Sequence, residues 1–125
     1  DIIWRGDGYE IVHRFHAAEA LKISKAAGGS GRLDNLRDLA LIALYVERRF
    51  SPYPTDGVGA VTEEQWHTLG ADIDDDFVFV FQEWRIPNVL TPFPPIANAL
   101  LLDIEPQAQL FVRIETPSGV EERRM

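Results

Sequence analysis

Hydrophobic and polar positions alternate at the start of the chain. Between residues 9 and 15 the odd positions hold Tyr, Ile, His and Phe, while the even positions include Glu and Arg. A period of two is typical of a strand that buries one face. A second β-prone run covers residues 2–5, and Gly6-Asp7-Gly8 separates the two runs. The pattern predicts a β-hairpin that places His13 on the buried face.

The following segments change to a helical period. Residues 16–27 are rich in Ala and are followed by two glycines, which is a common way for a helix to end. Between residues 33 and 50 apolar side chains recur every three or four positions, and Pro52 ends the pattern. A capping-box pattern from Thr62 to Gln65 predicts a third, short helix over 62–69.

The second half of the chain reads mainly as strands. Residues 77–85 are apolar at both odd and even positions, which predicts an interior strand of a sheet. Residues 99–104 and 109–116 predict two further strands, and residues 120–125 return as an edge strand after a turn.

Together these elements predict one α+β domain over residues 1–125. We expect a mainly antiparallel sheet of four to six strands with two to three helices packed on one face. The expected order is β-β-α-α-(α)-β-β-β.

Composition narrows the chemistry. The chain has no cysteine, which excludes disulfides, thiolate metal sites and cysteine nucleophiles. Its net charge of −8 is concentrated in residues 51–112, which hold ten acidic residues and one basic residue. Such a surface repels phosphate, so nucleic acid and anionic membranes are poor partners. No apolar run exceeds eight residues, too few to cross a membrane, and we expect a cytoplasmic protein.

The acidic run contains the first candidate site. Asp72, Asp74 and Asp76 alternate, and Glu83 follows at the spacing of an EF-hand loop. An EF-hand is excluded because Phe77 occupies the position that must turn sharply. The three aspartates remain candidates for contact with a basic partner, or for a looser divalent-cation site. A solvated, solubilising segment is the simpler interpretation.

Aromatic side chains supply further contact candidates. Tyr53 and Phe93 lie in proline-rich loops, where a pre-ordered backbone loses less entropy on docking. Trp66 completes the predicted contact surface. The simpler alternative is that the two loop aromatics fold back over the core.

Two functional hypotheses follow. The first is a non-catalytic protein-interaction domain, a binding, inhibitory or assembly subunit, whose partner is another protein, with a basic one favoured, or a second copy. The second is a small enzyme or small-molecule-binding protein. It would have a pocket between sheet and helices, built from His13, His67, Glu83 and Trp84. The sequence assigns no catalytic residue, no cofactor and no metal.

Overall fold

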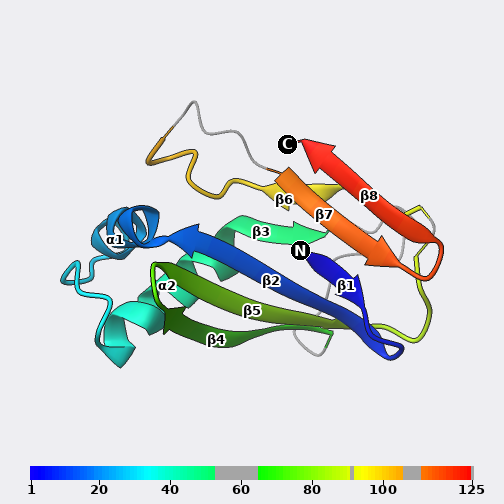
Figure 1. The fold of residues 1–125 in the computed structure, drawn as a ribbon, viewed down its shortest axis with the longest axis horizontal. Helices are drawn as coiled ribbons and strands as arrows, with labels where there is room; N and C mark the ends of the chain where they lie inside the picture. Colours follow the sequence, from blue (N-terminus) through cyan, green and yellow to red (C-terminus); the bar gives the residue numbers. More distant parts are fainter. Residues whose placement is uncertain (53–64, 91, 106–110, 125) are drawn as a thin grey trace.

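A six-stranded sheet dominates the computed structural model, which describes residues 1–52, 65–90, 92–105 and 111–124 (Figure 1). In spatial order its strands are β4 (Trp66–Asp74), β5 (Phe77–Arg85), β2 (Gly8–His16), β1 (Ile2–Trp4), β7 (Phe111–Thr116) and β8 (Gly119–Arg124). Two helices, α1 (Ala17–Ala26) and α2 (Leu36–Arg49), follow β2. A separate two-stranded sheet pairs β3 (Phe50–Pro52) with β6 (Ile96–Asn98). The predicted α+β class is therefore confirmed.

The sheet is mixed rather than purely antiparallel. β1 pairs antiparallel with β2 on one side and parallel with β7 on the other, and the remaining neighbours are antiparallel. The first hairpin lies in the middle of the sheet, with β2 paired to β5. The outer edge of β1 is therefore open to β7, which returns from the second half of the chain and runs parallel to β1.

The helices cover one face of the sheet. α2 packs against β4 and β5, and α1 packs against β2 and β5 (Figure 1). On that side the odd residues of β2 and the even residues of β5 are buried. They join the helices in one hydrophobic cluster. We call the opposite side the open face, because no helix or strand among the described residues packs on it.

The helix starts have clear local causes. His16 caps α1 by accepting a hydrogen bond at Nδ1 from the Ala18 amide, while Glu19 accepts one from the His16 amide. Asn35 caps α2 by accepting from the Asp38 amide at 2.8 Å. Side-chain acceptors at these positions satisfy amides that have no partner inside the helix.

The predicted third helix is wrong where it can be checked. Residues 66–69 belong to β4, and residues 62–64 of the capping box lie outside the described residues. β5 is apolar on both faces and needs a hydrogen-bonded neighbour on each edge. β4 supplies one of them, and this pairing overrides the local helix signal.

The predicted strand over 99–104 is also wrong. The strand lies just earlier, at β6, and residues 100–104 form turns in which Leu101 has a φ of 65°. The Tyr45 hydroxyl of α2 holds this segment. It accepts a hydrogen bond from the Leu101 amide and donates one to Asp103. Tertiary contacts therefore decide the backbone here.

A buried aspartate organises the link between the helices. Asp38 is 1% exposed, and its carboxylate accepts hydrogen bonds from the amides of Ser30 and Arg32 and from the hydroxyls of Ser24 and Ser30. The Arg32 amide is the largest cause that lowers the pKa of Asp38, to about 2. The link is therefore wrapped around an ionised side chain.

We predict that Asp38→Asn lowers the melting temperature at pH 7, because an amide NH₂ would replace one acceptor among these donors. The Asp38 pKa lies below its ordinary value of 3.8. Its contribution to stability is therefore complete above pH 4 and is lost as the pH falls through about 2. Melting curves of both proteins from pH 7 to pH 2 should converge at the acid end. The control is Asp34→Asn, an exposed neighbour. Equal effects of the two substitutions at pH 7 would contradict the prediction.

Candidate functional site

Three phenylalanines line the centre of the open face. Phe77, Phe79 and Phe81 occupy the odd positions of β5, whose even positions point into the core. Their ring centroids are 6.4 Å apart from one to the next, and each side chain is only half-buried. This phenylalanine row is therefore an apolar stripe on the side of the sheet that lacks helices.

Charged side chains flank the phenylalanine row on both neighbouring strands. On β4, Asp72 pairs with Phe79 and Asp74 pairs with Phe77. On β2, Arg14 pairs with Phe79 and His16 pairs with Phe77. The row thus has carboxylates along one side and an arginine and a histidine along the other.

The β2 side contacts the rings directly. The Arg14 guanidinium carbon lies 5.0 Å from the centre of the Phe77 ring, and the His16 ring packs edge-on against the same ring at 5.6 Å. A cation over an aromatic face is attracted by the ring's negative charge distribution. The Arg14 guanidinium therefore lies against the row at the level of Phe77.

A cleft of about 750 Å³ opens at the end of the phenylalanine row near the β1–β2 turn. Phe81 and Leu69 give it apolar walls, and Gly70, with a φ of 143°, keeps side-chain bulk out of it. Glu10 and Glu83 pair across β2 and β5 at its floor.

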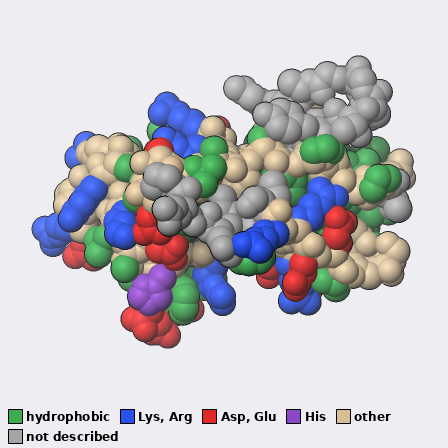
Figure 2. Space-filling view, turned by 90° about the horizontal axis from the view of Figure 1, so that it is seen from above, with side chains coloured by type: hydrophobic (Ala, Val, Ile, Leu, Met, Phe, Trp, Pro, Cys, Tyr) green, Lys and Arg blue, Asp and Glu red, His purple; other side chains and the backbone are tan. Residues whose placement is uncertain are grey.

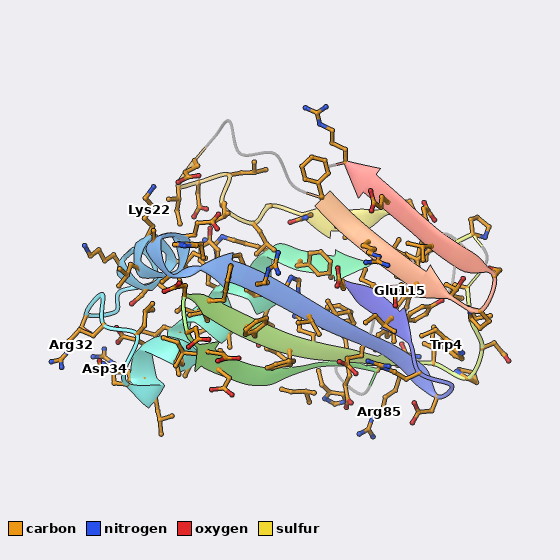
Figure 3. All side chains as sticks on the ribbon, viewed as in Figure 1. Trp4, Lys22, Arg32, Asp34, Arg85 and Glu115 are labelled. Atoms are coloured by element: carbon orange, nitrogen blue, oxygen red, sulfur yellow. The ribbon has the colours of Figure 1, made fainter. Side chains whose placement is uncertain are left out.

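Each of these two glutamates has its own cation. Arg5 binds Glu10 at 3.0 Å, and Arg85, which projects from the end of β5 (Figure 3), binds Glu83 at 3.0 Å. Like charges placed directly opposite in a sheet repel each other, and the two arginines offset that repulsion. Asp7 and Asp72, which also line the cleft, leave it with an excess of negative charge.

His13 lies on the other face of the sheet, as the alternation predicts. Its Nε2 is hydrogen-bonded to Gln82 at 2.6 Å, and the Gln82 amide donates to Thr68 at 3.1 Å. Burial is the main cause that lowers the pKa of His13 to about 4, which the Gln82 hydrogen bond partly opposes. A histidine with this pKa is neutral at pH 7 and is a weak general base.

The second predicted site is therefore split by the sheet. His67 and Glu83 are cross-strand partners on the open face, whereas His13 and Trp84 are buried on the helix side. A pocket between sheet and helices cannot contain all four residues, because neighbouring positions of a strand face opposite sides. A cavity of about 390 Å³ does lie beside His13, lined also by Glu19 and Glu105.

The predicted contact surface is also divided. Asp72 and Asp74 lie on the open face, and Asp76 lies in the turn that leads into β5. Trp66 stacks against Phe50 on the helix side, and Tyr53 lies outside the described residues.

Phe93 is 6% exposed and does not form an exposed anchor. Its ring packs edge-on against Tyr9 and Trp84. Arg123 of β8 donates hydrogen bonds to the backbone carbonyls of Phe93 and Pro94. The proline-rich loop therefore folds back over the core, which is the simpler of the two alternatives that its sequence allows.

The phenylalanine row was not predicted as a surface. One feature of the sequence pointed to it. In residues 9–15 the charged side chains Glu10 and Arg14 occupy even positions, which marks the solvent-facing side of that strand. Pairing β2 with β5 puts those even positions beside the odd positions of β5. That pairing is a long-range feature, and the sequence does not specify it.

Further findings limit the chemistry of the described residues. They contain no group of three His, Asp or Glu side chains that could hold a metal ion. No helix among them is long and apolar enough to span a membrane. Seen from above, acidic and basic side chains are interspersed, so this side of the molecule is not uniformly negative (Figure 2).

Comparisons with family models, curated proteins and solved structures find no match to this chain.

We predict that His13 makes stability depend on pH. The unfolded chain takes up its proton near the ordinary pKa of 6.5 and the folded chain only near 4, so stability falls as the pH drops through this interval. Between pH 7.5 and 5 the loss from this group is about 2 kcal/mol. Urea unfolding of His13→Gln should lack that part of the loss. His16→Gln, which removes an exposed histidine, should keep it, and equal behaviour of the two variants would contradict the prediction.

Proposed function

We propose that this protein is a non-catalytic protein-interaction module that binds its partner through the open face. The observation that carries the proposal is the phenylalanine row on the face that no described helix covers. Aromatic side chains offer large contact areas with little conformational entropy to lose, and they are enriched where proteins bind each other.

Two other exposed apolar side chains lie on the same side of the sheet, at its far edge. Phe111 is 68% exposed and Val120 is 57% exposed. Both alternate with inward-facing residues of β7 and β8, so they point to the same side as the phenylalanine row. β2 and β1 separate them from the phenylalanine row, so they are isolated surface side chains and the proposal does not rest on them.

The charges beside the row favour a protein partner. Asp72 and Asp74, with the neighbouring turn residues Asp75 and Asp76, give the β4 side a local negative charge. Phosphate-rich ligands are repelled there, and basic side chains are attracted. The partner surface is therefore apolar at its centre and basic where it meets β4.

We predict that Phe79→Thr weakens partner binding at least tenfold while the fold persists, because Thr favours strands and Phe79 packs outside the core. The measurement is affinity capture of host proteins, with each captured protein then titrated against the purified chain. Leu36→Thr is the matched control, since Leu36 is the first residue of α2 and is 85% exposed. A partner that binds the Phe79→Thr chain as tightly as the wild type would contradict the proposal.

The cleft supports a second candidate, the binding of a small molecule. Its volume of about 750 Å³ lies within the usual range for ligand pockets, roughly 300–1,000 Å³. Its apolar walls and excess of negative charge suit a cationic molecule with an apolar part. A thermal-shift screen of such compounds should find ligands whose stabilisation is lost in Leu69→Arg, which places a cation in the cleft. Stabilisation that survives this substitution would exclude the cleft as the site.

A further inference from the structure

The open face has a repeating pattern across three strands. Each level along β5 contains one β4 residue, one phenylalanine and one β2 residue. In order, the levels are Asp74-Phe77-His16, Asp72-Phe79-Arg14 and Gly70-Phe81-Val12. At the middle level the charges on the two sides of the phenylalanine are opposite, and the first level has a carboxylate facing a histidine.

This pattern decides how two copies of the face could meet. Two sheets that pack face to face keep their strands within about 30° of each other. A two-fold axis along β5 then places the β4 side of one copy over the β2 side of the other. An axis across the strands instead places Asp72 over Asp72 and Arg14 over Arg14. Only the first arrangement joins opposite charges.

We infer that the partner of the open face is a second copy of this chain, packed face to face about a two-fold axis parallel to β5. The inference rests on the proposed function and names its partner. A two-fold interface uses the same patch on both copies, so each favourable contact occurs twice.

The levels fit one another in this arrangement. In backbone register, Asp72 of each copy lies opposite Arg14 of the other, and Phe79 meets Phe79 on the axis. The Arg14 guanidinium leans toward Phe77, so it lies between Asp72 and Asp74 of the facing copy. Gly70 meets Val12, and a side chain has room there because no atom lies within 4 Å of the place a Cβ would take at Gly70. Glu83 also lies on the axis, where Arg85 of its own chain offsets the meeting of two carboxylates.

The size of the overlap sets the strength of the dimer. Only β4, β5 and β2 overlap, because β4 is the edge of the sheet. Three strands of nine residues cover about 14 by 30 Å. That is roughly 420 Å² on each copy, about half of the roughly 800 Å² per partner in a standard-size interface, and it is typical of weak, transient contacts. We therefore expect a dimer that dissociates on dilution, with a dissociation constant in the micromolar range.

Charge exchange between the two sides tests the inference. In sedimentation experiments across concentrations, Asp72→Arg alone and Arg14→Glu alone should each weaken the dimer at least tenfold, because like charges then meet twice. A one-to-one mixture of the two variants should restore the dimer, since every meeting pair is again opposite. Asp34→Arg and Arg32→Glu, in the link before α2 (Figure 3), are charge-matched controls that should leave the wild-type dimer unchanged.

Phe111 tests the direction of the axis. β7 is three strands from β5, outside the overlap for an axis along β5 but inside it for an axis across the strands. Phe111→Thr should therefore leave dimerisation unchanged while Phe79→Thr abolishes it. A loss of the dimer in Phe111→Thr would overturn the proposed axis.

Cross-linking provides a measurement that does not depend on the charge variants being folded. Since the chain has no cysteine, Glu83→Cys places a single thiol on the axis and Asp34→Cys places one far from it. A bis-maleimide that spans the spacing of about 10 Å between packed sheets should link the first protein to itself and not the second.

Three results would overturn the inference: a wild-type monomer at 0.5 mM (roughly a hundredfold above the expected constant), single charge variants that remain dimeric, or a mixture that stays monomeric. A monomer that still binds another protein through Phe79 would leave the proposed function standing and remove only the second copy as its partner.

Discussion

The pairing of β5 with β2 and β4 is the constraint on which the rest of the structure depends. β5 is hydrogen-bonded over its whole length to β2 and over most of it to β4. Its even positions complete the hydrophobic core, and this burial orients the strand. The odd positions must then face the other way, and the sequence fills three of them with phenylalanine. A one-residue slip of this register would exchange the two sets.

The one-sided cover of the sheet follows from the order of elements. Both helices lie between β2 and β4 in the chain, and both pack on the same side. Their link is fixed by Asp38, and Tyr45 of α2 holds the turns that follow β6. These polar contacts use the helix side of the molecule. They leave the phenylalanine row to be covered, in our account, by another molecule.

Much of the fold could be predicted from local patterns. The hairpin with His13 facing inward, both long helices and the interior strand at 77–85 all follow from periodicity, because each has a regular apolar repeat. Residues 66–69 could not be predicted, because a local helix signal was overruled by an edge of β5 that needed a partner. The role of Phe93 depended on Arg123, thirty residues away, which has no local signal. The open face could not be predicted either, because it forms only when β2 pairs with β5, and this long-range pairing has no local signal.

In this account the phenylalanine row is covered by another chain. Solvent paramagnetic relaxation of side-chain protons, followed by NMR over a range of protein concentrations, tests this most directly. In dilute protein the ring protons of Phe77, Phe79 and Phe81 should relax strongly, while the methyl groups of Val78 and Val80 stay protected. At high concentration, or with a bound partner, the ring protons should become protected as well. Rings that are protected equally at every concentration would contradict the account.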